Sequence, residues 1–452
     1  MALSAHTDNR SNSLNDSSDR PLPQMFADIF ADDEPPPPPS PPKKHKEIKK
    51  QPNDPNFAQQ NRGIDPRMFA APQTAASKAG NPTESCHKVD PVIIRDELYY
   101  HKHVIEGCEL LSPLEAGAHA IYQVIDREHV AAKVYAHFDI LTKKYAGLSV
   151  KGVRSYKNFE EDEIKEADLK NPAIVKGLAI SLAMSYFMEE DDFTRRNGSK
   201  YGFRIDFDMS LRSIFGFFKN SGYTDGLFRA YNIERFVITP EDIKNFPDIK
   251  ASKLFYWPTI THPYVHEKMR GIAEALHSAS GNDFNEKENK IIIQLKDDKD
   301  FIYYKYRTFL KFLLLDRHDY RTRFAQHIRE SERHPLPQYH NKKINDVLAD
   351  HMEWRKQQLR DVLVQMPSFH DFLFDHGNQA IAEIMKDFAE ENRIIMESEA
   401  KKRKKDPTRS REIMLDHVLT LQNVRNNYDA IYAETSKYFL HVSNDDTPTQ
   451  KP

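Results

Sequence analysis

The sequence predicts an α+β protein in which a strand-rich region comes before helices and the last third is an all-α domain. Short apolar runs between residues 121 and 135 are typical of strands, whereas apolar residues after residue 340 recur at helical spacing. Pro335 and Pro337 mark a boundary before that helical third. The positions that keep helical spacing are Ile344, Leu348, Met352, Leu359 and Leu363, followed by Met414, Val418, Leu421, Val424, Tyr428 and Ile431.

Composition indicates several regions along the 452 residues. The mean hydropathy of −0.72 is low for one compact core, so a polar tail must dilute the average. We expect residues 1–89 to be a disordered tail, 90–334 a folded domain, 335–440 a helical domain and 441–452 a second disordered tail. The proline run at residues 35–42 fits a stiff spacer or, alternatively, a ligand for an SH3- or WW-type groove.

The charge balance and the cysteines exclude several classes of protein. The net charge is −3, which gives no sign of nucleic-acid binding. Cys86 and Cys108 are too few for a disulfide framework or a zinc site and suit a reducing compartment. No signal peptide is recognisable, and the longest apolar stretch, from Ala173 to Met188, is interrupted by Lys176. We therefore expect a soluble or peripheral protein with no transmembrane segment.

Individual elements follow from local patterns. Ile121–Ile125 and His129–Tyr135 are interpreted as two strands of a hairpin. Asn171 and Pro172 are typical of a helix start, and the apolar residues after them predict a buried helix. Phe203–Phe207 is predicted to be a strand.

Farther along the chain, Ile291–Ile293 is interpreted as one more strand. The segment from Phe301 to Phe324 is predicted to be helical.

Two acidic motifs carry most of the functional information. Asp192 and Asn197 are five positions apart, and Asp206 ends a short apolar run, where an unpaired acid would be costly to bury. An acid that aligns a hydroxyl, together with an amide and a second acid that hold a divalent metal, are the parts that phosphoryl transfer needs. Asp191 competes with Asp192 for the first role, and Asp208 is a candidate further metal ligand or a structural hydrogen-bonding group.

A lysine and a loop of small residues add candidate nucleotide contacts. Lys133 at the end of the predicted hairpin could pair with the α- and β-phosphates of ATP, or could simply be solvated. Gly117 and Ala118 precede that hairpin and would let backbone amides approach phosphates, although an ordinary turn is an equally good reading.

The order of these features resembles the protein-kinase-like superfamily. Val130-Ala131-Ala132-Lys133 corresponds to its lysine strand, Asp192–Asn197 to its catalytic loop and Asp206-Phe207-Asp208 to its Asp-Phe-Gly metal motif. The match is better to the atypical and phosphoinositide-kinase-like branches. Ser155–Phe159, Gly177–Ala179 and Arg204–Leu211 look like kinase-like effectors that Legionella and related intracellular bacteria secrete into host cells.

This resemblance implies a bilobal atypical kinase-like fold, with a small β-rich N-lobe and a helical C-lobe. It further implies ATP and Mg²⁺ or Mn²⁺ as cofactors, with Asn197 and Asp206 on the metal, Lys133 on the phosphates and Asp192 as the catalytic acid. The function implied is a protein Ser/Thr kinase that acts as a secreted bacterial effector on a host protein, in the host cytosol or at a membrane surface. A lipid kinase and a pseudokinase-type docking protein remain alternatives.

Several positions depart from the family pattern. Glu190-Asp191, Thr194 and Asp208 stand where the family has other residues, and no glutamate partner for the lysine is identified. Its candidates are Glu160, Glu161 and Glu163.

Basic clusters suggest a site for an inositol phosphate activator or a phosphoinositide headgroup, although they could be solvated faces. The candidate residues are Lys143, Lys144, Lys151, Arg154, Lys157, Lys401, Lys402 and Arg403. Two further groups are Arg195, Arg196 and Lys200, and Lys305, Arg307, Lys311, Arg317, Arg321 and Arg323.

Overall fold

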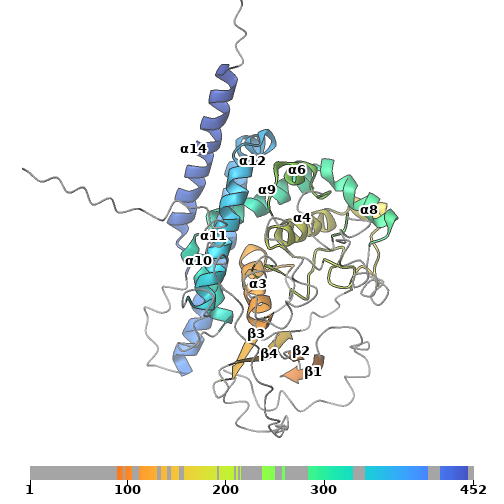
Figure 1. The fold of residues 1–452 in the computed structure, drawn as a ribbon, viewed down its shortest axis with the longest axis vertical. Coiled ribbons are helices and arrows are strands. Elements are labelled where there is room, and N and C mark those ends of the chain that lie inside the picture. The colour runs from red at the N-terminus through yellow and green to blue at the C-terminus, as the bar shows by residue number, and fades with distance from the viewer. Residues whose placement is uncertain are drawn as a thin grey trace, which may run out of the picture. The chain divides into compact units, whose positions relative to one another are not determined.

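A computed structural model describes most of the chain after residue 88, and helices dominate it (Figure 1). The described residues are 89–94, 97–103, 111–129, 134–139, 144–151, 157–190, 193–207, 210–211, 214, 237–249, 257–259, 284–328, 342–405 and 418–445. Among these residues, no helix is both long enough and apolar enough to cross a membrane.

The strands of the described chain form one four-stranded antiparallel sheet in the order β1-β2-β4-β3. The strands are β1 (Val89–Ile94), β2 (Glu97–His103), β3 (Val134–Asp139) and β4 (Lys144–Lys151). The helix α3 (Leu111–Ile125) lies between β2 and β3 in the sequence and packs against β3 and β4. Helix α3 therefore covers part of the sheet. The sequence had not predicted this helix, because it assigned Ile121–Ile125 to a strand of a hairpin.

The rest of the described chain is helical. Its α-helices are α4 (Pro172–Phe187), α6 (Pro240–Asn245), α8 (Glu286–Ile293), α9 (Lys299–Leu314), α10 (Arg317–His327), α11 (Ile344–Leu363), α12 (Pro367–Lys405) and α14 (Leu421–Asp445). Two short 3₁₀ helices, η3 (Glu166–Lys170) and η7 (Gln294–Asp297), precede α4 and α9.

Helix α4 begins where the sequence predicts it. The Asn171 side chain accepts a hydrogen bond from the Ala173 amide at 3.0 Å, and Pro172 occupies the first helical position. Almost every residue from Ile174 onward is buried, because α4 packs against α9 and lies in the interior. The predicted helix over Phe301–Phe324 is confirmed as two helices, α9 and α10, separated at Leu315 and Asp316.

Three predicted strands are wrong. Ile121–Ile125 is the last part of α3, and Ile291–Ile293 is the end of α8. Phe203–Phe207 contains only the isolated bridge between Arg204 and Gly198. In the first two cases, a short apolar run does not distinguish a strand from one buried face of a helix, and tertiary packing decided for the helix.

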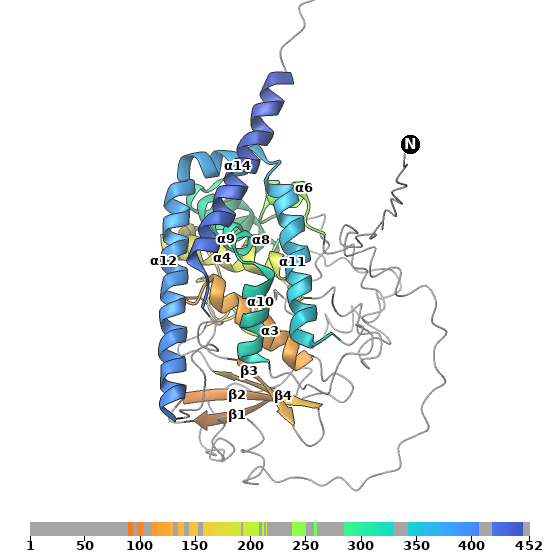
Figure 2. The same cartoon turned by 90° about the vertical axis from the view of Figure 1, so that its left-hand side faces the viewer.

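The helices near the end of the chain pack directly on the region around α3 (Figure 2). Helix α10 contacts both α3 and α11, and α12 contacts α9 and α14. Since α3 also covers the sheet, it is enclosed between the strands and these later helices. The predicted division at residues 334 and 335 is not tested by these contacts and stays a prediction.

Candidate functional site

A lysine of the sheet meets two carboxylates, one from the helix that follows its strand and one from a segment about a hundred residues later in the chain. The Lys102 ammonium on β2 contacts Glu115 Oε1 on α3 at 2.9 Å and also pairs with Asp206. The exposed fractions of the Lys102 and Glu115 side chains are 12% and 3%, and that of Asp206 is 29%. One positive and two negative charges leave a net negative site whose Asp206 side is open to solvent.

The flanking elements position these three groups. Lys102 pairs with Val89 and Leu148 in the centre of the sheet, so its backbone is fixed on both sides. Glu115 lies in the first turns of α3 and is buried against the sheet. The chain thus brings a strand lysine and a helix glutamate together over a separation of 13 residues.

A tight hairpin places Asn197 beside the segment that carries Asp206. The Ile205 amide donates to the Asn197 carbonyl oxygen at 3.0 Å, and Gly198 bridges to Arg204. Asn197 is buried, and its neighbour Gly198 packs against the rings of Phe193 and Phe159. Amide and carboxylate oxygens are the ligands that Mg²⁺ prefers, so the donor chemistry of Asn197 and Asp206 fits a divalent cation.

Non-glycine residues with left-handed backbone conformations lie in and around this hairpin. Of the residues that the structure describes, the non-glycine residues with positive φ are Glu189 at 55°, Asp206 at 62° and Leu211 at 56°. Left-handed backbone is tolerated by Asp but is costly for Glu and Leu. Residues held in this conformation cluster at functional sites, where the surroundings fix a side chain in a required direction.

A buried ion pair joins the two sides of the hairpin. The Arg204 guanidinium lies 3.7 Å from the Glu190 carboxylate, and both side chains are fully buried. The Ser210 hydroxyl also donates to Glu190, and the Arg204 guanidinium lies 4.2 Å from the centre of the Phe193 ring. Burial, and then the Glu190 charge, raise the pKa of the neighbouring Tyr122 hydroxyl, which stays protonated.

Helix α11 holds the chain just before this pair. Arg355 donates to the carbonyl oxygens of Tyr186 and Phe187 at 3.0 Å each, where α4 ends. It also lies 3.3 Å from Glu189, which contacts His351 at 3.2 Å. Arg355 therefore adds hydrogen bonds to the last carbonyls of α4, and it fixes the start of the loop that leads to residue 192.

The sequence-predicted site residues are only partly described. Lys133, Asp191, Asp192 and Asp208 lie outside the described residues, so their predicted roles stay predictions. Of the predicted metal ligands, Asn197 and Asp206 lie on neighbouring segments.

The phosphate loop predicted at Gly117 and Ala118 is wrong, because both residues lie inside α3 and are buried. A Cβ atom on Gly117 would meet Phe324 and Leu348 at 3.1 and 3.2 Å. The glycine serves close packing between helices and leaves no room for a nucleotide there.

Lys102 and Glu115 are the site residues that sequence reasoning missed. The sequence predicted that the end of α3 is a strand, and its candidate lysine was Lys133, which lies outside the described residues. A signal was available, because Tyr99 and Tyr100 have high strand propensity and the residues from Leu111 onward can form a helix that contains Glu115. The predicted glutamates Glu160 and Glu163 pair instead with Arg196 and Arg195, each at 3.1 Å.

Most of the described basic clusters are paired with acids. Arg195 contacts Glu288 at 3.2 Å, and Lys200 contacts Asp162 at 2.8 Å, so these groups stabilise the fold around the hairpin. Lys157 and Lys401 are exposed. The other members of the proposed inositide sites lie outside the residues whose side chains are described, so these sites stay predictions. Those members are Lys143, Lys144, Lys151, Arg154, Lys402 and Arg403.

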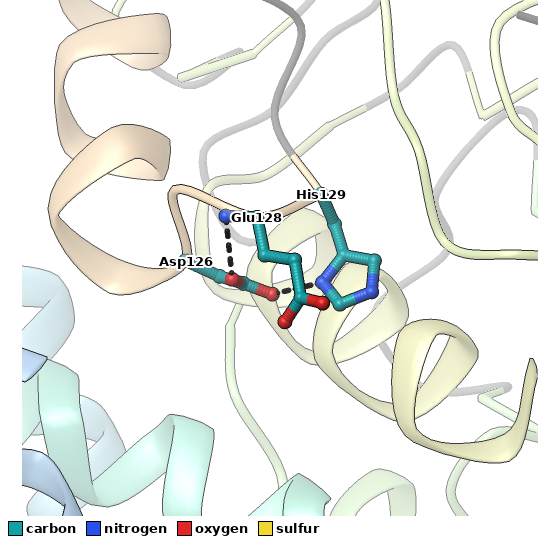
Figure 3. A group of neighbouring side chains, drawn as sticks. All are labelled: Asp126, Glu128 and His129. Carbon is teal, nitrogen blue, oxygen red and sulfur yellow. Dashed lines mark hydrogen bonds and ion pairs between the residues drawn. The ribbon is translucent and has the colours of Figure 1, made fainter. Parts of the chain in front are cut away.

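A second acidic cluster closes the turn after α3. Asp126, Glu128 and His129 place their ligand atoms within 4.8 Å of one another (Figure 3). Asp126 accepts hydrogen bonds from the Glu128 amide at 3.0 Å and from the His129 ring at 2.5 Å. Burial favours the protonated form of Asp126, but the hydrogen bond and charge of His129 hold its pKa below the usual value.

Lys176 contacts Glu128 at 3.0 Å and supplies a positive charge to this cluster. Because Lys176 pairs with Glu128 and the His129 ring hydrogen-bonds to Asp126, we assign the cluster to the turn rather than to a metal.

No protein-family model matches this chain. A comparison with curated proteins likewise finds no significant relative. The residues whose geometry bears on the function are Lys102, Glu115, Asn197 and Asp206.

Proposed function

We propose that this protein is an ATP- and divalent-metal-dependent phosphotransferase with a kinase-like fold. The observation that supports it best is the meeting of Lys102, Glu115 and Asp206. Protein kinases require an ion pair between a strand lysine and a helix glutamate, together with an aspartate that holds the metal. A strand lysine, a helix glutamate and an aspartate after a tight hairpin are the same three parts.

In this proposal, each residue has a distinct task. Glu115 orients the Lys102 ammonium, which pairs with phosphate oxygens of ATP. Asn197 and Asp206 hold Mg²⁺ or Mn²⁺, which neutralises charge on the transferred phosphoryl group. Asp192, five residues before Asn197, orients the acceptor hydroxyl and accepts its proton. Our first choice of acceptor is a protein Ser or Thr, with a lipid or an inositol phosphate as alternatives.

The direct test is phosphoryl transfer from γ-labelled ATP in the presence of Mg²⁺ or Mn²⁺, with and without host-cell extract. We expect label with the wild type and none with Asp206→Ala or Lys102→Met. Lys176→Met is the matched control, because Lys176 also pairs with a glutamate but lies on α4, where its partner is Glu128 of the surface turn after α3. Equal labelling of protein by the wild type and both site variants would exclude this function.

A docking function at an anionic membrane is the second candidate. Lys401 and Lys404 are exposed at the C-terminal end of α12, within five consecutive basic residues from 401 to 405. Each basic residue near an anionic leaflet contributes about 1 kcal/mol to binding. Binding to vesicles with and without phosphoinositides should separate the two candidate functions. Docking is favoured if the protein has no transfer activity and Asp206→Ala binds phosphoinositide vesicles as well as the wild type does. Equal binding to neutral vesicles would exclude it.

In either case, we propose that the protein is a bacterial effector secreted into a host cell, because its motifs resemble those of secreted kinase-like effectors. Detection of the protein in host cytosol during infection would test it.

A further inference from the structure

Helix α3 is held on the face that points away from the sheet. Gly117 packs so closely against Phe324 of α10 and Leu348 of α11 that a Cβ atom would approach both within 3.2 Å. Residues from Leu114 to Ile125 are almost all buried. The helix that carries Glu115 therefore cannot move outward unless the later helices move with it.

The C-terminal end of α3 is fixed by a buried lysine. Lys311 of α9 donates to the Ile125 carbonyl oxygen at 2.6 Å and is 4% exposed. The same ammonium lies 2.5 Å from Asp387 of α12. Lys311 therefore links the last carbonyl of α3 to the side chain of a helix more than 250 residues away in the sequence.

Helix α12 presents an acidic stripe to this region. Glu383, Asp387 and Glu391 are four residues apart and share one face of the helix. Glu383 and Asp387 contact Arg307 of α9 at 2.9 and 2.5 Å.

Glu391 continues the stripe to the turn after α3. It contacts Arg127 in that turn at 2.5 Å and Arg323 of α10 at 3.5 Å. The stripe therefore pairs with Arg307, Lys311 and Arg323 of the basic cluster that the sequence suggested as a polyphosphate site. Arg317 and Arg321 of that cluster pair instead with Asp346 of α11.

The turn after α3 connects this stripe with the candidate site. Arg127 of that turn is held by Glu391, and the next residues contact α4 through Lys176 and Glu128. The His129 carbonyl oxygen accepts a hydrogen bond from the Arg204 amide at 3.4 Å, two residues before Asp206. Movement of α12 would thus reach both the Glu115 helix and the Asp206 segment.

We propose that the acidic stripe of α12 is a built-in brace that holds α3 in the position where Glu115 meets Lys102. This inference rests on the proposed function, and it makes Asp387 and Glu391 positioning residues for the nucleotide site. The chain then assembles the lysine–glutamate pair with its own helices, without an external partner. If the stripe acts as a brace, removal of its charges should loosen α3 in particular. If its contacts only stabilise the protein, their removal should loosen all helices equally.

The test compares Asp387→Asn and Glu391→Gln with the wild type in the full chain. Hydrogen exchange of peptides from residues 111–129 is the first readout, and ATP affinity with Mg²⁺ is the second. We expect exchange in 111–129 to accelerate about tenfold, the size expected for loss of one buried charge-assisted hydrogen bond, and ATP affinity to fall severalfold. Asp387→Glu should restore both readouts, because the Asp387 side chain is 41% exposed and has room for one methylene.

Glu434→Gln is the matched control. Glu434 of α14 binds Arg360 of α11 through two hydrogen bonds of 2.8 and 2.5 Å, but it contacts neither α3 nor the turn after it. We expect it to leave exchange in 111–129 unchanged. If the brace variants accelerate exchange equally in every helix, or leave 111–129 as protected as in the wild type, the brace is refuted. If α3 loosens as expected while even the wild type fails to bind ATP, the brace stands and the proposed function fails.

Discussion

Arg204 and Glu190 form an ion pair at 3.7 Å with both side chains fully removed from solvent. Glu190 begins the loop that leads to Asn197, and Arg204 lies two residues before Asp206. The pair therefore joins the two chain segments that carry the proposed metal ligands. Desolvation makes such a pair costly to build, but removal of one partner leaves an uncompensated buried charge, which is worse.

Arg204→Met should destabilise the protein by about 3–5 kcal/mol, because it leaves the Glu190 carboxylate buried without its cation. Glu190→Gln together with Arg204→Met should recover part of that loss. The free energy of unfolding in urea measures both variants. A double variant as unstable as the sum of the two single variants would show that the residues are not coupled.

Glu115→Gln should lower kcat/KM for phosphoryl transfer by about tenfold to a hundredfold, since it removes one charge-assisted hydrogen bond to Lys102. Lys102→Met should lower it further, because the cation itself is lost. Steady-state kinetics with ATP measure both, and circular dichroism checks that the fold persists. An unchanged kcat/KM in Glu115→Gln would contradict the proposed role of the pair.

Gly117→Val should destabilise the protein by about 1–3 kcal/mol, the usual cost of overpacking. The Cβ alone would lie 3.1 Å from Phe324, and the two extra methyl groups have no space in the contact between α3 and α10. Gly117→Ala is the milder comparison, because it gains helix propensity while requiring a shift of only a few tenths of an ångström. Thermal unfolding measures both, and equal stability of Val and Ala variants would show that the contact can expand.

Lys305→Met should stabilise the protein at or below pH 7 and lose that advantage toward pH 10. Burial, with repulsion from Lys296, lowers the pKa of the Lys305 ammonium to about 7. The folded state therefore binds fewer protons than the unfolded state between about pH 7 and 10.5, so wild-type stability rises with pH in that window. The methionine removes the cost of the buried charge, for a net gain of about 2 kcal/mol after loss of the hydrogen bond to the Ile243 carbonyl oxygen.

Unfolding at pH 6 and pH 9.5 checks the sign of this effect. Lys290→Met is the control, because the Lys290 side chain is 70% exposed and pairs with its helix neighbour Glu286. A gain for Lys305→Met that is larger at pH 9.5 than at pH 6 would contradict the argument.

Local sequence signals correctly predicted helices that are marked by capping residues or by a repeated apolar face. Asn171 and Pro172 predicted the start of α4 because capping depends on adjacent residues. The helical spacing after residue 340 predicted α11 and α14 because a repeated apolar face needs burial wherever the helix packs. The two acidic motifs likewise singled out Asn197 and Asp206, which the structure places on neighbouring segments of a short hairpin.

The sequence by itself therefore predicted the start of α4 and the helices after residue 340, and it singled out the two oxygen ligands proposed for a metal. Only the tertiary structure decided that the run to Ile125 is a helix, that Glu115 on it faces Lys102, and that Glu391 of α12 contacts the turn after α3. The physical reason is the separation along the chain over which each kind of interaction acts. Caps and periodicity act over a few neighbouring residues, whereas the partner of a buried charge is chosen by the whole packing arrangement and can lie anywhere along the chain.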